Sequence, residues 1–170
     1  MNRIALILCV LFFMSCSEKK SSKKEVPTIV EKKELIVKVY LKTDVEDVFS
    51  IRMDNIQVDE FQKKNIFIRE TIPLSTGYES ITANFGPNNF SKHIHFGLGK
   101  KLKTVDLKTI EFTYKGNTLT ITKENFNDYL QVNDSAELNL EDFSINTKNV
   151  IANKNPEISV KYSTIQFLSK

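Results

Sequence analysis

The stretch IEFTYKGNTLTIT, residues 110–122, carries the strongest structural signal in this 170-residue chain. On both sides of Gly116-Asn117 the residues are mostly β-branched or aromatic, and apolar and polar side chains alternate. Alternation with a period of two is typical of a half-buried strand. Glycine and asparagine tolerate the positive φ that a tight two-residue turn requires. The stretch therefore predicts a β-hairpin that turns at Gly116-Asn117.

The same period of two recurs along most of the chain after residue 33, beginning with ELIVKVYLK, residues 34–42. There the apolar set Leu35, Val37, Val39 and Leu41 alternates with positions that include Glu34, Lys38 and Lys42. A run of this kind predicts a strand with one face in the core and one face in solvent. The predicted strands are 34–42, 47–53, 65–72, 79–86, 92–98, 108–114, 118–123, 136–140, 149–153 and 157–168. FGPNNFS, residues 85–91, is rich in turn formers and predicts a second turn.

One segment favours a helix: TKENFNDYL, residues 122–130, opens with Thr122 and brings Phe126, Tyr129 and Leu130 to one side. Many short strands and little helix predict an all-β fold. We therefore expect an antiparallel, jelly-roll-like β-sandwich with one short helix over residues 34–170, with a closed barrel as the alternative.

The N-terminus, MNRIALILCVLFFMSC, has the layout of an export signal. Arg3 supplies a positive charge, and an apolar run of 11 residues follows from Ile4 to Met14. A run of this length is too short to span a bilayer, which needs about 20 residues. We therefore expect residues 1–15 to be a signal peptide.

The last residues of that signal, FMSC at 13–16, resemble the lipobox of bacterial lipoproteins. Ser15 is the small residue beside the scissile bond, and Cys16 is the residue that would receive the lipid; Phe13 departs from the usual Leu. The resemblance implies acyl chains such as palmitate on Cys16, and more than one chain makes an anchor stable. Ser17, in place of the Asp that retains lipoproteins in the inner membrane, implies the outer membrane, facing the periplasm or the cell surface.

Residues 16–33 are expected to form a flexible tether. They carry six lysines and three acids, so their net charge is +3. So polar a segment buries too little apolar surface to fold. Its lysines could also lie against anionic headgroups.

The charge and cysteine content of the body exclude several functions. Residues 34–170 carry 17 cations and 18 acids, so the body has no positive excess with which to attract nucleic acid. Both cysteines lie in the first 16 residues, so the body has no disulfide and no thiol nucleophile. No cofactor motif and no catalytic serine motif is present, and we expect no cofactor and no enzyme activity.

Two groups of side chains are candidates for a metal site. His93 and His95, in KHIHF, would lie on one face of a strand, but a zinc site needs a third protein ligand from another strand. The three acids of KTDVEDV, Asp44, Glu46 and Asp47, could supply oxygens to calcium, although the segment lacks a recognised calcium-loop pattern. In both cases ordinary surface residues are the favoured interpretation.

Tyr40 and Tyr114 are the candidates for a sugar-binding face, because both lie in predicted strands on the side expected to face away from the main apolar set. The strand layout of residues 34–168 is similar to the jelly-roll modules that bacteria attach to envelope proteins, including carbohydrate-binding sandwiches. That resemblance implies a binding or structural module for glycan or protein. The alternative is a glycan-acting hydrolase that uses surface carboxylates.

Overall fold

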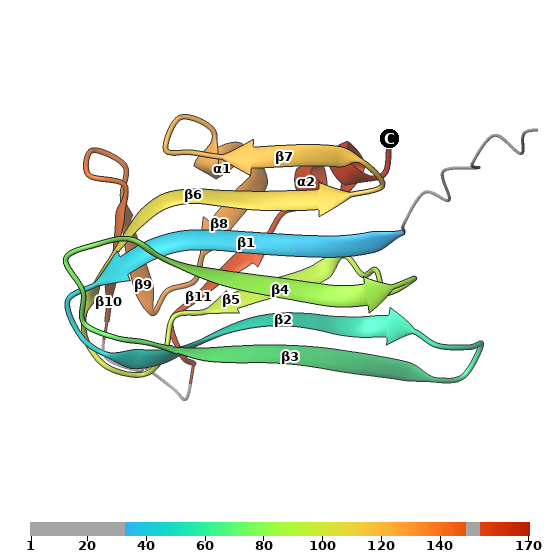
Figure 1. Cartoon of the computed structure of the whole chain (residues 1–170), viewed down its shortest axis with the longest axis horizontal. Helices are drawn as coiled ribbons and strands as arrows, with labels where there is room; N and C mark the ends of the chain where they lie inside the picture. Colours follow the sequence, from blue (N-terminus) through green and yellow to red (C-terminus); the bar gives the residue numbers. More distant parts are fainter. Residues whose placement is uncertain (1–32, 149–153) are drawn as a thin grey trace, which may run out of the picture. The chain divides into compact units, whose positions relative to one another are not determined.

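The computed structural model describes residues 33–148 and 154–170. The predicted signal peptide, Cys16, all of the predicted tether except Lys33, and the predicted strand 149–153 lie outside the described residues. The elements, shown in Figure 1, are β1 (Glu34–Thr43), β2 (Asp47–Gln57), β3 (Lys63–Ile72), β4 (Glu79–Pro87), β5 (His93–Gly97), β6 (Thr104–Tyr114), β7 (Asn117–Ile121), α1 (Phe126–Tyr129), β8 (Leu130–Val132), β9 (Ala136–Asn139), β10 (Ser144–Thr147), β11 (Glu157–Val160) and α2 (Tyr162–Leu168).

The strands form two antiparallel sheets, which confirms the predicted all-β sandwich. The first sheet has the order β4-β1-β6-β10-β9, and the second has the order β3-β2-β5-β11-β8. The long strand β6 pairs with β1 along one edge, and on its other edge its first residues pair with β10 and its last residues pair with β7.

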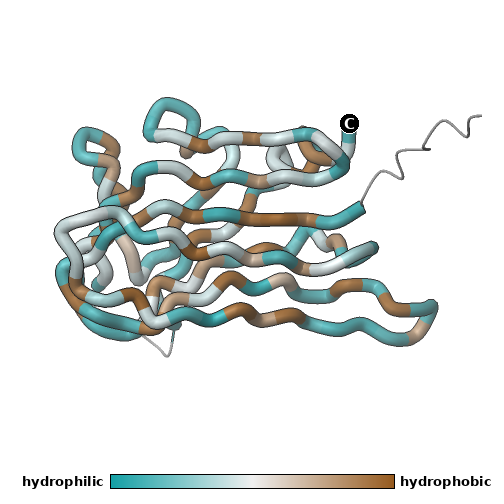
Figure 2. The backbone as a smooth tube through the Cα atoms, viewed as in Figure 1, coloured by the Kyte–Doolittle hydropathy of each residue, from teal (hydrophilic) through white to brown (hydrophobic). Residues whose placement is uncertain are grey.

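Hydrophobic and hydrophilic residues alternate along many of the strands, as the change of colour in Figure 2 shows. Along β1, Leu35, Val37, Val39 and Leu41 are at most 4% exposed. All buried hydrophobic residues of the described chain lie between residues 35 and 168, and the described residues, 33–148 and 154–170, belong to one compact unit. This body therefore contains a complete core of its own.

A β-bulge in β6 accommodates an irregular apolar pattern. Leu107 and Ile110 are both buried although they are three residues apart. Leu107 pairs with Leu41, whereas Thr109 pairs with Tyr40, so one residue of β6 is left without a partner on β1. The extra residue allows the side chains on both sides of the bulge to point into the core.

The predicted hairpin forms, but its turn lies one residue earlier than expected. Tyr114 pairs with Asn117, so the two turn residues are Lys115 and Gly116, with φ of 49° and 78°. Positive φ at both positions is typical of a type I′ turn, whose twist matches that of the strands. Asn117 is instead the first residue of β7.

The prediction of one strand over residues 157–168 is wrong in its second half. β11 ends at Val160, and residues Tyr162–Leu168 form the helix α2. Ile165 and Leu168 are buried, and their spacing of three residues fits a helix that rests one face on the core. The structure thus has a second short helix besides α1, which is limited to Phe126–Tyr129 of the predicted segment 122–130. Neither helix in the described residues is long and apolar enough to cross a bilayer.

Candidate functional site

The outer face of the second sheet carries an open groove, and the strand register positions its residues. Side chains that face outward alternate with core residues along β2, β3, β5 and β11. One row across the four strands consists of Arg69, Ser50, Gly97 and Glu157, and the next row consists of Phe67, Arg52, His95 and Ser159. The groove follows from the first row, because its two middle residues are small.

Ser50 and Gly97 form the floor of a pocket of about 480 Å³. A Cβ added at Gly97 would lie 2.5 Å from the hydroxyl oxygen of Ser50, so only glycine leaves the floor at this depth without a shift of its neighbour. Arg69, Phe67 and Lys100 line the sides of the pocket.

Phe67 offers an exposed aromatic ring with two guanidinium groups near it. Half of its surface is exposed. The guanidinium carbons of Arg69 and Arg52 lie 5.5 and 5.9 Å from its ring centre, within the range of cation–π attraction. Among the described residues, neither Arg69 nor Lys100 makes a side-chain ion pair. Two positive charges of the lining are therefore available to a ligand.

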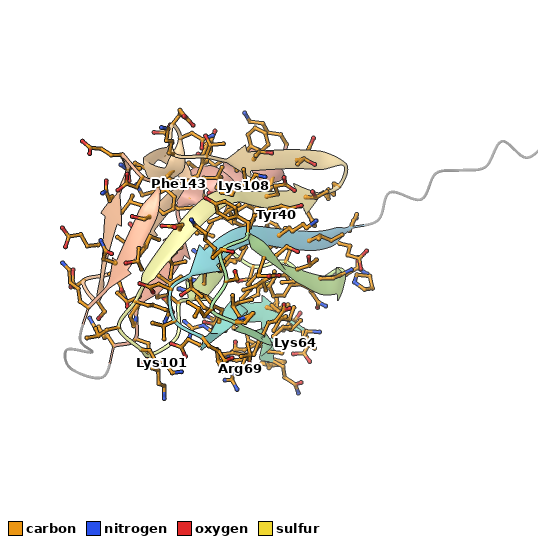
Figure 3. The ribbon with its side chains drawn as sticks, turned by 60° about the vertical axis from the view of Figure 1, so that its left-hand side comes forward. Tyr40, Lys64, Arg69, Lys101, Lys108 and Phe143 are labelled. Carbon is orange, nitrogen blue, oxygen red and sulfur yellow. The ribbon has the colours of Figure 1, made fainter. Side chains whose placement is uncertain are left out.

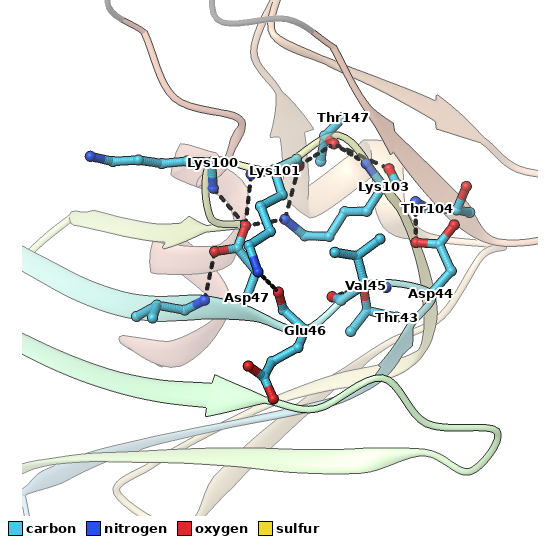
Figure 4. A network of polar contacts seen from close by, with 11 residues as sticks. Thr43, Asp44, Val45, Glu46, Asp47, Lys100, Lys101, Lys103, Thr104 and Thr147 are labelled. Atoms are coloured by element: carbon cyan, nitrogen blue, oxygen red, sulfur yellow. Dashed lines mark hydrogen bonds and ion pairs between the residues drawn. The ribbon is translucent and has the colours of Figure 1, made fainter.

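The acidic residue Asp47, which also lines the groove, is already saturated by partners from the protein (Figure 4). Its Oδ1 accepts a hydrogen bond from the amide of Val48, and its Oδ2 accepts from the amides of Lys100 and Lys101 and from the Nζ of Lys103 at 2.6 Å. Burial alone would raise the pKa of Asp47, but the hydrogen bonds from Lys103 and the backbone amides outweigh it and lower the pKa to about 2. Asp47 thus holds the β5–β6 loop against the start of β2 and keeps its charge.

Glu157, the other acid of the lining, is likewise held by protein partners. Its Oε1 lies 2.8 Å from Nδ1 of His95, and its Oε2 accepts a hydrogen bond from Arg52 at 3.3 Å. Burial acts to raise the pKa of Glu157, but the hydrogen bond and charge of His95 and the charge of Arg52 outweigh it, so the pKa is lowered. The acids of the groove are neutralised within the protein, and the lining as a whole favours an anion.

The two histidines were candidates for a metal site, and among the described residues no three His, Cys, Asp or Glu side chains are grouped to hold a metal ion. His93 and His95 alternate with the buried Ile94, so they share the outer side of β5 as predicted. Glu157 contacts Nδ1 of His95, whereas Asp54 lies 3.9 Å from Nε2. The two carboxylates approach different ring nitrogens, so they do not converge on one ion.

Asp44, Glu46 and Asp47 do not point their carboxylates toward a common centre. An Oδ1 of Asp44 accepts a hydrogen bond from the amide of Thr104 at 2.9 Å, which ties the loop to β6. The backbone carbonyl of Glu46, rather than its side chain, accepts a hydrogen bond from Lys101 at 2.7 Å. With Asp47 bound to the β5–β6 loop, these residues fasten the end of the sandwich (Figure 4).

The two candidate tyrosines lie on different sides of the first sheet. Tyr114 is only 9% exposed, with its ring stacked on Phe90 at 4.5 Å between ring centres, so the expectation that it faces outward is wrong. Tyr114 is in phase with the buried Ile110 and Phe112, so the regular alternation of β6 brings its ring to the core side. Tyr40 is half-buried on the outer side, and the Nζ of Lys38 lies 4.6 Å from its ring centre. Figure 3 shows Tyr40 and Lys108 on the side of the sandwich away from Lys64 and Arg69.

Comparison with models of known protein families gave no match, and neither comparison with curated proteins nor comparison with solved structures gave one. The assignment of the groove as a candidate site therefore rests on its geometry alone. Four groove residues were not predicted from the sequence, because a cation or an aromatic ring on the polar face of a strand is common: Arg52, Phe67, Arg69 and Lys100. The spacing of Phe67 and Arg69 indicates that the two side chains share one face of a strand. Only the strand register, however, shows that Arg69 lies in the same row as Ser50 and Gly97.

Proposed function

We propose that this protein is a lipid-anchored envelope lipoprotein whose β-sandwich is a binding module, and that the groove of the second sheet binds an acidic glycan. The observation that carries the proposal is the pocket of about 480 Å³ in which Arg69 and Lys100 lie beside the exposed ring of Phe67. A pocket with an apolar surface and a few fixed polar groups is the usual form of a ligand site.

The chemistry of these three side chains favours a sugar that bears a carboxylate. A guanidinium group binds a carboxylate with two parallel hydrogen bonds, so Arg69 can fix the position of the acid, and Lys100 adds a point charge. The C–H face of a pyranose ring packs on an aromatic ring such as Phe67. The hydroxyl of Ser50 on the groove floor can bond to sugar hydroxyls.

The ligand proposal is tested by titrating the protein with uronic-acid oligosaccharides, with neutral oligosaccharides of equal length and with poly-glutamate. We expect binding to the uronic acids only, with an affinity that falls as salt is raised. Arg69→Ala should remove most of this binding, because Arg69 is exposed and its loss leaves the core intact. The matched control is Lys108→Ala, which removes an exposed cation from the first sheet.

Two results would decide against an acidic glycan. Equal binding of the neutral oligosaccharides would show that charge does not select the ligand. Stronger binding of poly-glutamate would make an acidic protein segment the ligand of the groove.

The lipid anchor is supported by the export signal and the lipobox-like FMSC at residues 13–16. We expect the wild-type protein to fractionate with the outer membrane, facing the periplasm or the cell surface. Cys16→Ala should remove the acyl chains and release the protein from the detergent-extracted membrane fraction. Retention of the variant in that fraction would contradict the assignment of Cys16.

No observation favours the alternative, a glycan hydrolase that uses surface carboxylates. Such an enzyme needs one carboxyl group with a raised pKa to serve as general acid. The pKa of Glu157, the half-buried acid of the groove, is lowered instead. Its oxygens are already bound to His95 and Arg52.

A further inference from the structure

The chain enters the body at one end of the sandwich, where β1 begins at Glu34. Glu34 pairs with Pro87 at the end of β4. In the loop that follows, the hydroxyl of Ser91 donates a hydrogen bond to the carbonyl of Asp54 on β2. Beyond Asp54, β2 leads into the β2–β3 hairpin, so this hairpin projects at the same end as the start of β1 (Figure 1).

The tip of that hairpin, residues 58–62, presents Phe61 to solvent. Phe61 is 92% exposed, more than any other large hydrophobic residue of the described chain. The tip has a defined conformation: Oδ1 of Asp59 accepts hydrogen bonds from the amides of Phe61 and Gln62, both at 2.8 Å, and the amide of Val58 donates to the carbonyl of Gln62 at 3.0 Å. A fixed turn that displays one aromatic ring loses little conformational entropy when that ring is buried by a partner.

Several lysines lie at the same end of the sandwich as this ring. We call this region the entry end; it consists of residues 33–34, 58–64, 88–92 and 115–116. Its charged residues are Lys33, Lys63, Lys64, Lys92, Lys115, Glu34, Asp59 and Glu60, with a net charge of +2. Residues 33–170 as a whole carry 18 cations and 18 acids, a net charge of 0, so positive charge is concentrated at this end.

We propose that the entry end is a membrane-contact surface, with Phe61 inserted among the headgroups of an anionic bilayer and the lysines around it bound to lipid phosphates. An exposed apolar residue within a basic rim is the arrangement of interfacial membrane contacts. A bilayer fits this end better than a protein partner, because the tether predicted to carry the lipid leaves the body here. Anchoring turns a weak contact into an intramolecular one, with an effective concentration in the millimolar range.

The test attaches residues 31–170, the compact unit with a complete core, to vesicles through a histidine tag placed before residue 31 and a nickel-chelating lipid. This attachment does not use Cys16, so a failure of the lipoprotein proposal leaves the test unaffected. The body has no cysteine, so a single introduced thiol is labelled uniquely with an environment-sensitive fluorophore. Gln62→Cys reports on the entry end, and Thr76→Cys, in the β3–β4 loop at the other end, is the matched control.

On vesicles that contain anionic lipid, we expect the label at position 62 to shift to shorter wavelength and to be quenched at least about twofold by a lipid-borne nitroxide. The label at position 76 should stay in water. Phe61→Ser in the Gln62→Cys background should abolish the quenching. Each of Lys63→Gln and Lys64→Gln should lower the partitioning by up to about fivefold.

Water-like emission from both positions would overturn the proposal and leave Phe61 as a contact for another protein. Equal quenching at positions 62 and 76 would also overturn it, because the contact would then have no preferred end. Quenching at position 62 that is the same on neutral and anionic vesicles would overturn the role of the lysines.

Discussion

The carboxylate of Asp47 lies 2.6 Å from the ammonium nitrogen of Lys103, whose side chain is fully buried, and this ion pair joins the start of β2 to the end of the β5–β6 loop. The same ammonium group lies 5.2 Å from the ring centre of Phe49 and donates a hydrogen bond to the carbonyl of Lys101. A buried charge of this kind is tolerated only when it has partners. The buried Lys103 therefore needs its counter-ion more than Asp47 needs Lys103, because Asp47 also accepts hydrogen bonds from backbone amides.

Removal of the acid should cost more stability than removal of the base. Asp47→Asn leaves the ammonium of Lys103 buried without its counter-ion, which costs about 3–5 kcal/mol. Lys103→Met keeps the volume of the side chain, and Asp47 keeps its backbone donors, so we expect a loss of about 1–3 kcal/mol. Urea unfolding of both variants measures the difference.

The control for this pair is the exposed ion pair of Lys148 with Glu137, whose side chains are 46% and 65% exposed. Lys148→Met should change the free energy of unfolding by less than about 1 kcal/mol. The double variant of Asp47 and Lys103 should lose less than the sum of the single losses. Additive losses would show that the two charges do not interact.

The lowered pKa of Asp47 predicts how the stability of the protein changes as the pH falls. Its folded pKa, about 2, lies below the ordinary 3.8, so the stabilisation is complete well above the ordinary value and is lost as pH falls toward 2. The stability difference between wild type and Asp47→Asn should therefore shrink by up to about 2 kcal/mol between pH 6 and pH 2. Denaturant unfolding at a series of pH values measures this, and a constant difference would contradict it.

Local sequence patterns predicted the strands better than the site. Alternation in β1 and the hairpin of β6 and β7 depend on nearest neighbours, so both could be recognised. The helix α2 was missed because SVKYSTIQFL fits a period of two as well as a helical spacing, and only packing on the core decides between them. Arg69, Ser50 and Gly97 come from three strands, and no local pattern specifies the register that aligns them.

The turn of the β6–β7 hairpin allows a test of backbone strain alone. Gly116 has a φ of 78°, and a Cβ added there would meet no atom within 4 Å. Gly116→Ala should therefore lower the free energy of unfolding by about 1–2 kcal/mol, the cost of a left-handed conformation for alanine. Gly77→Ala is the matched control, because its surroundings are equally open and its φ is not in the left-handed region. Thermal unfolding of the two variants should differ, and equal melting temperatures would show that the turn relaxes without cost.

Substitutions at the floor of the groove should affect the stability of the fold and the binding of the ligand differently. Gly97→Ala places a Cβ 2.5 Å from the hydroxyl oxygen of Ser50, so Ser50 must leave its rotamer, and we expect a loss of about 1–2 kcal/mol. Ser50→Ala in the same chain removes the oxygen, and the nearest remaining atom, the Cβ of residue 50, lies at an ordinary 3.8 Å.

Urea unfolding should therefore find the double variant more stable than Gly97→Ala alone. Its groove is still shallower by one methyl group and lacks the floor hydroxyl, so uronic-acid binding should stay weak although stability returns. Ser50→Ala alone, which keeps Gly97, is the control for the hydroxyl. If the double variant regained binding together with stability, the depth of the floor at Gly97 would have no part in ligand recognition.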